Sequence, residues 1–394
     1  MKLPRDFSFV FFGLTRFDAL PQRDRWIAAE IAARGYRVMY IEPMPSAASA
    51  LRTILRKTVS PASNDVIGGH IPLPPSIKIL RPPLIPTFFT SSFTPSVDRR
   101  IFRRWFSKTF REFQWSKSII FLSYPYWWPD FVDRSSAPAR LFVYDRCDSL
   151  AVPSRTHSVR WMLEELDGEL LKSADVVTFS ALGLRPSRGS VGRRTELIEI
   201  PNAVSREYLR NGSLMKPLKH ERPVVGMCGA FDRRWVDDDL MVQVVERFPN
   251  VTFSIVGPVD GASARKLRRF THVRLHGPVP FPMLPSILSQ WDVAIIPFRE
   301  NEITDSLNPL KLYEYLGAGL PVVATSTREL RRYSSLVELA AGTNGFVRGI
   351  ENALKDGSRS RRNMRKQFAR RNTWTDRVDT LLHALEAKLA RLSA

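Results

Sequence analysis

The amino-acid sequence predicts an α/β protein made of two doubly wound, Rossmann-like parallel-sheet domains. Short apolar runs rich in β-branched residues alternate along the chain with longer amphipathic stretches, which is the pattern of repeated βα units. The pattern stops at a polar segment, residues 211–222, and then begins again. The length of 394 residues suffices for two or three domains at about 150 residues each. Hydrophobic residues make up 44 % and charged residues 25 %, a balance that excludes wholesale disorder.

The first predicted domain covers residues 1–210. Its elements in order are a strand at 7–13, a helix at 24–34 that ends at Gly35, and strands at 37–41, 118–122, 141–144, 176–180 and 197–200. Residues 51–95 break the alternation because they are rich in proline, which removes a backbone donor and disfavours helix. We therefore expect an extended insertion there and no core element.

The second predicted domain covers residues 223–372 and follows a linker at 211–222. Its strands are expected at 224–228, 251–256, 273–276, 293–297 and 321–325, and its helices at 235–248 and 310–316. Ligands of doubly wound domains bind at the carboxyl ends of the strands. We therefore expect the two domains to face each other across a cleft that holds the site.

A formal net charge of +20 is the first indication of function. Basic surfaces attract nucleic acid, anionic lipid or phosphorylated substrates, and here the charge is concentrated in residues 99–117 and 359–371. For the second run a solvated helix face is the simpler interpretation. Two cysteines exclude a disulfide framework and suit a cytoplasmic protein. No apolar run reaches the roughly 20 residues of a spanning helix, and the run at 7–14 lacks the cleavage site of a signal peptide.

The segment 308–324 carries the clearest chemistry. Asn308 is a good N-cap, and Pro309 suits the first position of the helix. Lys311 then lies in the first turn, where a positive charge costs roughly 0.3–1 kcal/mol against the helix dipole. This cost indicates that an anion binds there, because free backbone N–H groups favour phosphate at the same point. Glu314 lies on the same face, and its carboxylate can accept two ribose hydroxyls, although a simple Lys–Glu pair would have the same spacing.

This segment resembles the nucleotide-sugar site of GT-B glycosyltransferases, in particular the bacterial family 4-like (group 1) enzymes of polysaccharide assembly. The resemblance covers nearly the whole chain and is weakest over 51–113. The stretches that carry it are 21–23, 35–38, 201–204, 225–231, 255–258, 275–277, 302–304, 308–311 and 372–374. It implies a GT-B architecture whose last helix, from residue 373, returns to the first domain.

By this resemblance the chain transfers a hexosyl group from a UDP- or GDP-linked sugar. Lys311 would neutralise the diphosphate, Glu314 would hold the ribose, and Gly229 would let the backbone approach the donor. Arg233 or Arg234 would be a second phosphate ligand, with an ordinary surface loop as the open alternative. The expected donor site is completed by Asn308, Pro309 and Tyr315.

No metal or other cofactor is expected, because GT-B enzymes do not generally hold a catalytic metal through a run of aspartates. The run at 237–239 is therefore predicted to cap a helix, where acidic side chains suit the dipole.

The sequence offers several candidates for the catalytic group. Many retaining relatives carry an acidic residue eight positions before the ribose glutamate, and that position is Ser306 here. Glu302 or Glu300 would compensate, or the family branch differs, so retention and inversion both stay open. An inverting enzyme needs a base for the acceptor hydroxyl. Asp148 and Asp145 are the candidates, with Asp18 in the first loop behind them. For Asp145 and Asp18, a cap or a loop salt bridge is favoured.

The stretch 99–117 suggests where the acceptor is met. Aromatic residues recur there near helical spacing, with arginines and lysines between them. This pattern suits an interfacial helix on anionic lipid, and equally a core-facing helix with a basic outer face. The first interpretation predicts a lipid-linked saccharide acceptor and a peripheral enzyme on the inner face of the cell membrane.

Function classes other than exopolysaccharide or capsule synthesis fit the sequence less well. An epimerase of GT-B shape would need more acidic and histidine groups than the sequence offers. A nucleic-acid-binding protein would explain the charge, but it would leave Lys311 and Glu314 unused, so no nucleic-acid partner is expected. A catalytically inactive scaffold of the same fold is the remaining alternative.

Overall fold

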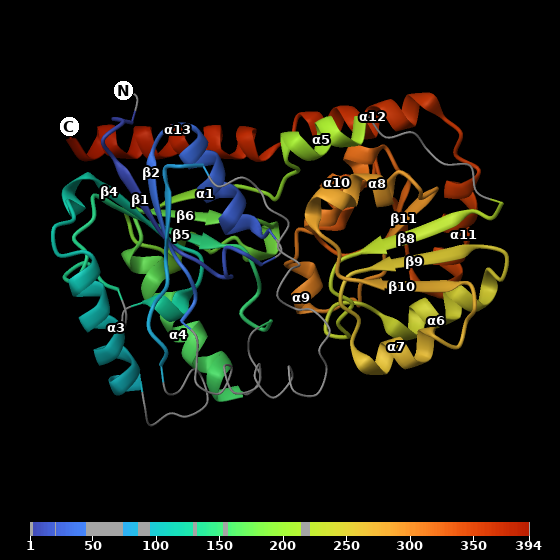
Figure 1. Ribbon diagram of the computed structural model, residues 1–394, viewed down its shortest axis with the longest axis horizontal. Helices are drawn as coiled ribbons and strands as arrows, with labels where there is room; N and C mark the ends of the chain where they lie inside the picture. Colours follow the sequence, from blue (N-terminus) through green and yellow to red (C-terminus); the bar gives the residue numbers. More distant parts are fainter. Residues whose placement is uncertain are drawn as a thin grey trace. The chain divides into compact units, whose positions relative to one another are not determined.

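The computed structural model describes residues 3–19, 21–44, 74–85, 95–128, 132–152, 157–213 and 221–393. The chain divides into two compact units (Figure 1). The first unit comprises Met1–Ser180, Leu184–Ile200 and Val378–Ala394, and the second comprises Ala181–Gly183 and Pro201–Arg377. The change between units therefore comes at residue 201, about ten residues before the boundary predicted from sequence.

The first unit contains a seven-stranded parallel sheet with the order β3-β2-β1-β4-β5-β6-β7. Its strands are β1 Ser8–Phe12, β2 Arg37–Ile41, β3 Ile77–Leu80, β4 Ser118–Leu122, β5 Leu141–Arg146, β6 Val176–Phe179 and β7 Glu196–Glu199. The central strands β1 and β4 are buried at every residue, because helices cover both faces of a parallel sheet. These helices are α1 Arg23–Ala33, α3 Pro95–Thr109, α4 His157–Ser173 and the final helix α13 Trp374–Ser393. In Figure 1, α3 and α4 lie on one side of the sheet and α1 on the other.

Strand β3 corrects the expectation that residues 51–95 hold no core element. It pairs with β2 in parallel, with Val38 opposite Ile77 and Ile41 opposite Leu80. The prolines around it are tolerated because β3 is the edge strand of the sheet. The rest of the predicted insertion, at 51–73 and 86–94, lies outside the described residues.

The second unit contains a six-stranded parallel sheet with the order β10-β9-β8-β11-β12-β13. Its strands are β8 Val224–Cys228, β9 Thr252–Val256, β10 Val273–Gly277, β11 Val293–Ile296, β12 Val322–Thr325 and β13 Glu338–Ala340. Its helices are α5 Arg206–Ser213, α6 Asp238–Arg247, α7 Gly261–Leu267, α8 Leu284–Leu288, α9 Glu302–Asp305, α10 Leu310–Ala318, α11 Gly342–Leu354 and α12 Arg359–Arg370. One face packs against α5, α8 and α10, and the other packs against α6 and α11 (Figure 1).

Short 3-10 turns complete the two units. They are η1 Trp115–Lys117, η2 Pro125–Trp127, η3 Leu182–Leu184, η4 Arg188–Ser190, η5 Phe281–Met283 and η6 Leu330–Tyr333.

Helix α3 decides between the two interpretations of its aromatic side chains. Phe102, Phe106 and Phe110 are 0 %, 2 % and 5 % exposed, and they pack into the core under the sheet. Their rings stack on one another, with centroids 5.6 Å apart for Phe102 and Phe106. The expectation that these aromatic residues enter lipid is therefore wrong, because the sheet already covers them. The side chains that stay exposed on α3 include the basic residues Arg100, Arg104 and Lys108.

Candidate active site

Three strands of the second unit end in glycines with positive φ. Gly229 (φ 135°), Gly257 (φ 126°) and Gly277 (φ 69°) follow or close β8, β9 and β10. A Cβ atom on Gly257 would lie 2.1 Å from the carbonyl oxygen of Gly229, so no other residue fits this crossing. At Gly229 itself, the nearest heavy atom to such a Cβ is Cγ of Lys311 at 4.0 Å. The strand ends therefore leave open space directly in front of Lys311.

Lys311 and Glu314 form an ion pair on the first turn of α10. The Lys311 Nζ atom lies 2.8 Å from Oε2 of Glu314, and the two side chains are 28 % and 8 % exposed. Burial lowers the pKa of Lys311, but the Glu314 carboxylate more than offsets this and the pKa is raised overall. For Glu314 burial is the larger effect, and it raises the pKa although Lys311 opposes it. The ammonium is thus the securely charged member of the pair, as a ligand for phosphate must be.

The start of α10 differs from the sequence prediction. Pro309 occupies the N-cap position in an extended conformation and is not the first helical residue. Asn308 does not cap the helix, because its side-chain oxygen accepts hydrogen bonds from Asn202 N (2.9 Å) and the Tyr313 hydroxyl (3.2 Å). Asn308 is 3 % exposed and anchors the segment before the helix.

Tyr315 lies on α10 beneath the site. Its side chain is buried, and its hydroxyl accepts a hydrogen bond from Cys228 N at 2.6 Å. Because Cys228 ends β8 and precedes Gly229, this bond fixes the glycine turn against α10. Tyr315 therefore supports the candidate site by holding the end of β8 against α10, and it is not itself exposed to a ligand.

The two candidate arginines after Gly229 are not equivalent. Arg234 pairs with Asp232 at 2.8 Å and lies 4.8 Å over the Trp235 ring. The side chain of Arg233 is 56 % exposed, and its Nε atom is 3.5 Å from Oδ1 of Asp260. Arg233 is therefore the less constrained of the two.

Glu302, the candidate catalytic carboxylate of the second unit, is the first residue of α9 and is exposed, as is Glu300. Asn301 caps α9 and forms a capping box with Thr304. An acidic residue in this first turn also suits the helix dipole. Ser306, at the position where many relatives carry an acid, is the C-cap of α9.

Asp148 follows β5 at the carboxyl edge of the sheet in the first unit and is exposed to solvent. Desolvation raises the pKa of Asp148 to about 6. The positive charge of Arg23 opposes this shift, while the negative charges of Asp145 and Asp24 add to it. A carboxylate that is accessible, ionised at pH 7 and more basic than usual suits a general base.

Asp145 and Asp18 have the salt bridges favoured from the sequence. Arg23 binds Asp145 through two contacts of 2.8 and 2.9 Å, and Thr178 donates a third hydrogen bond at 2.5 Å. Asp145 is fully buried, so its oxygens are committed to the fold. Asp18 forms an exposed pair with Arg16.

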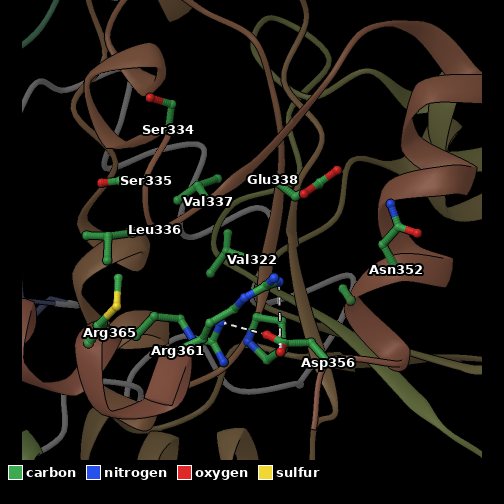
Figure 2. Close-up of a pocket in the computed structure, with 13 residues that line it drawn as sticks. Val322, Ser334, Ser335, Leu336, Val337, Glu338, Asn352, Asp356, Arg361 and Arg365 are labelled. Carbon is green, nitrogen blue, oxygen red and sulfur yellow. Dashed lines mark hydrogen bonds and ion pairs between the residues drawn. The ribbon is translucent and has the colours of Figure 1, made fainter. Parts of the chain in front are cut away.

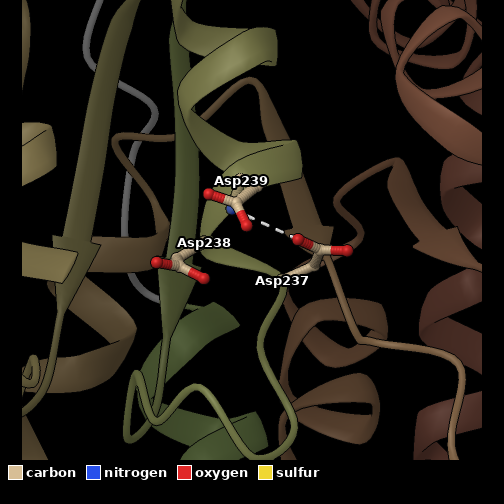
Figure 3. A group of neighbouring side chains, drawn as sticks. All are labelled: Asp237, Asp238 and Asp239. Carbon is tan, nitrogen blue, oxygen red and sulfur yellow. Dashed lines mark hydrogen bonds between the residues drawn. The ribbon is translucent and has the colours of Figure 1, made fainter.

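The acidic run 237–239 caps α6, as predicted. The Asp237 side chain accepts a hydrogen bond from Asp239 N (Figure 3) and a second one from Leu240 N. Asp238 is held by Lys266 at 2.7 Å and by Arg299 at 2.5 Å. These cations already balance the carboxylates, so the run has a structural explanation.

A cavity of about 260 Å³ lies elsewhere in the second unit (Figure 2). Val322 and Glu338, which line it, begin β12 and β13, so the cavity is at the strand edge opposite Gly229. Asp356 pairs there with Arg365 at 3.1 Å and with Arg361 at 4.0 Å. This cavity is therefore distinct from the candidate donor site. It lies at the other edge of the sheet, and its charged side chains already pair with one another.

The sequence prediction missed the residues that support the site from a distance. Asp24 accepts hydrogen bonds from Leu14 N and the Tyr40 hydroxyl at the first unit's strand edge. Tyr208 donates to the Glu314 carbonyl oxygen at 3.0 Å. These contacts join residues far apart in the chain, so no local spacing signals them.

The family described as "Glycosyl transferases group 1" matches residues 222–356. Over these residues the chain is similar to the group 1 glycosyl transferases. The matched residues hold the glycine turns and most of α10's surroundings, so the family expectation drawn from those motifs is confirmed.

A curated relative in Bacillus subtilis (strain 168), the putative teichuronic acid biosynthesis glycosyltransferase TuaH, is 26 % identical over 254 residues. That match covers 59 % of this chain and 63 % of the relative, less than two thirds of its length.

Solved structures show the same fold at low identity. Sucrose-phosphate synthase from Thermosynechococcus elongatus has a TM-score of 0.64 at 15 % identity, covering 98 % of this chain and 97 % of its own. Anabaena HepE, solved with UDP and glucose, has a TM-score of 0.64 at 14 % identity, covering 96 % and 99 %. The two Rossmann-like sheets and these matches establish the GT-B fold of this chain. Among the helices that the structure describes, none is long and apolar enough to cross a membrane.

Proposed function

We propose that this chain is a glycosyltransferase that moves a sugar from a UDP- or GDP-linked donor to a lipid-linked or polysaccharide acceptor during cell-surface polysaccharide synthesis. The observation that carries the proposal is the Lys311–Glu314 pair facing the Gly229 turn at the carboxyl edge of the second sheet. Two relatives support this class of enzyme. TuaH is a putative teichuronic acid biosynthesis glycosyltransferase, and the structure of HepE contains UDP and glucose.

The donor is proposed to bind with its diphosphate at the start of α10. Lys311 and the free N–H groups of the first turn meet the phosphates, and Arg233 approaches from the turn after Gly229. Glu314 accepts hydrogen bonds from the ribose hydroxyls. These positive groups stabilise the departing diphosphate, so the proposed reaction needs no metal. Activity is expected to survive EDTA, and full loss that Mg²⁺ restores would contradict this part.

The acceptor hydroxyl is proposed to lose its proton to Asp148. The acceptor oxygen then bonds to the sugar C1 as the bond from C1 to the phosphate oxygen breaks, and the nucleoside diphosphate leaves. This route inverts the anomeric configuration. If Glu302 acts in place of the acid that is absent at position 306, retention is expected. NMR of the product anomer separates the two.

The basic face of α3 is proposed to hold the enzyme on anionic lipid at the inner face of the cell membrane. Arg99, Arg100, Arg103, Arg104 and Ser107 line an open depression of about 510 Å³ on this helix. Each arginine near an anionic bilayer contributes about 1 kcal/mol. The attachment is electrostatic, because the aromatic face is buried in the core.

Vesicle sedimentation tests this attachment. The double variant Arg100→Gln, Arg104→Gln is expected to bind phosphatidylglycerol vesicles about thirtyfold more weakly at low salt, since two contacts of about 1 kcal/mol are lost. The exposed pair Lys355→Gln, Arg359→Gln in the second unit is the matched control. Equal binding by both double variants would argue against this surface.

The activity itself is tested by incubating the protein with UDP- and GDP-sugars and a lipid-linked acceptor in membrane extract, with nucleoside diphosphate release and the lengthened glycan as readouts. Acceptor-dependent release of one nucleotide supports the proposal. No donor consumption with any sugar nucleotide contradicts it and leaves the inactive scaffold. Tight, salt-sensitive binding to DNA or RNA without donor binding would favour a nucleic-acid role.

A further inference from the structure

The segment before α10 is held by a buried polar cluster, which we call the anchor cluster. Its members belong to three separate stretches of the second unit and are 0–7 % exposed. They are Asn202, Asn308, Tyr313, Glu329 and Tyr333.

Glu329 is the charged member of the anchor cluster and is completely buried. Its Oε1 atom accepts a hydrogen bond from Asn308 Nδ2 at 2.8 Å, and its Oε2 atom accepts one from Leu182 N at 3.1 Å. Arg332 supplies the counter-charge at 3.1 Å from Oε1. Through these hydrogen bonds the buried Glu329 carboxylate holds Leu182 and Asn308 against the turn that follows β12.

The charge of Glu329 fixes which way the Asn308 amide points. An ionised carboxylate only accepts hydrogen bonds, so Asn308 must present its NH₂ group to Glu329. Its oxygen then faces Asn202 N at 2.9 Å and the Tyr313 hydroxyl at 3.2 Å. Asn202 completes the link by donating to the Asn308 carbonyl oxygen at 2.6 Å.

This arrangement matters because α10 has no side-chain cap of its own. Pro309 at the N-cap makes no capping hydrogen bond, and Lys311 lies two residues further along. The orientation of the first turn therefore depends on how Asn308 is held. The Asn308 side-chain amide forms its hydrogen bonds within the anchor cluster and not with the first turn. The backbone N–H groups of that turn can therefore bind a ligand.

We infer that Glu329 is a positioning residue for donor binding, which acts through Asn308 to fix the first turn of α10 and the Lys311 ammonium. The inference rests on the proposed function, because it assigns Glu329 to the nucleoside diphosphate site. Glu329 itself does not touch Lys311 in any contact that the structure describes.

The first test is Glu329→Gln, which keeps the volume and removes one acceptor. Either Asn308 or Leu182 then faces an amide NH₂ group. Calorimetric titration with UDP, GDP and ADP should show that the nucleotide bound by the natural protein binds about ten- to a hundredfold more weakly. In turnover, KM for the donor should rise by more than kcat falls. Glu351→Gln, an exposed glutamate on α11, is the matched control and should change neither value.

A rescue separates positioning from simple stability. Asn308→Asp places two carboxylates at the 2.8 Å contact and should weaken binding at least as much. In the double variant Asn308→Asp, Glu329→Gln, the glutamine donates to the aspartate and accepts from Leu182, so these two hydrogen bonds are restored. The bonds from Arg332 to Oε1 and from Asn308 Nδ2 to the Tyr333 hydroxyl are not restored. The double variant should therefore bind the nucleotide more tightly than Asn308→Asp alone, because the contact between two carboxylates is removed.

The outcomes distinguish the inference from the proposed function. If the natural protein binds none of the three nucleotides, the proposed function fails. If it binds one, and folded Glu329→Gln binds it with the same Kd, Glu329 is only structural and the inference is overturned. A double variant that is folded but binds no better than Asn308→Asp also overturns it.

Discussion

Lowering the pH from 8 to 5 is expected to slow glycosyl transfer, because Asp148 must be ionised to accept a proton. With a pKa of about 6, about 99 % of this carboxyl is ionised at pH 8 and about 9 % at pH 5. The value of kcat/KM should therefore fall about tenfold over this range, with its midpoint near pH 6. Initial rates of nucleoside diphosphate release, at donor and acceptor concentrations well below their KM values, provide the assay.

Asp148→Asn sharpens the same test. Loss of a general base lowers the rate by about 10²–10⁴-fold, and the remaining activity should no longer titrate near pH 6. The raised pKa means that the folded state holds this proton more tightly than the unfolded state. Its stabilising contribution is therefore present at low pH and lost as the pH rises through about 6. The variant should thus have a higher Tm than the natural protein at pH 8.

Asp18→Asn is the control, because Asp18 is an exposed partner of Arg16 in the same unit. It should leave the rate and the pH profile unchanged. A flat profile in the natural protein, or full activity in Asp148→Asn, would refute the assignment of the base.

Three further predictions concern stability and the strand ends. Gly257→Ala puts a Cβ atom 2.1 Å from the carbonyl oxygen of Gly229, at a φ of 126°. The free energy of unfolding, measured with urea, should therefore fall by at least about 1–3 kcal/mol. An unchanged unfolding midpoint would mean that the turn does not need glycine. Phe106→Ala removes a ring that is 2 % exposed. The free energy of unfolding should fall by about 3–5 kcal/mol, and binding to anionic vesicles should stay the same. Loss of vesicle binding in the folded variant would instead favour insertion of this aromatic face into lipid. Arg23→Met leaves the buried Asp145 carboxylate without its counter-charge. In the same assay the free energy of unfolding should fall by about 3–5 kcal/mol. An unchanged free energy of unfolding would contradict the structural role of this ion pair.

Most of the fold could be predicted from the sequence because buried parallel strands are continuous apolar runs. Strand β4 was predicted at its observed bounds for this reason. Strand β3 was missed because it has four residues, its side chains are partly exposed, and prolines flank it. As an edge strand it needs little apolar character, so its sequence resembles a loop.

Helix α3 shows a different limit. Its spacing of phenylalanines four residues apart correctly predicts a helix with one apolar face. The same face suits a protein core and a lipid interface, since both are apolar. Only the contacts with the sheet decide between them.

The candidate site was predictable where its partners are neighbours in the chain. Lys311 and Glu314 are three residues apart, so helical periodicity brings them together. The bond between Asn202 and Asn308 joins residues separated by 106 positions, and Asn308 was consequently assigned a local capping role that it does not have. Sequence spacing carries no signal for such contacts.

The most direct test of the central claim is a calorimetric titration of UDP, GDP and ADP into the natural protein and into Lys311→Met. At about 4 Å and an effective dielectric of 20, one charge contact is worth about 4 kcal/mol, and solvent access to this side chain reduces it. We expect one nucleotide to bind the natural protein and to bind Lys311→Met about thirty- to several-hundredfold more weakly. Lys355→Met, at an exposed lysine of the same unit, should bind as the natural protein does. Equal affinity in the natural protein and Lys311→Met would contradict the assignment of the diphosphate site to the start of α10.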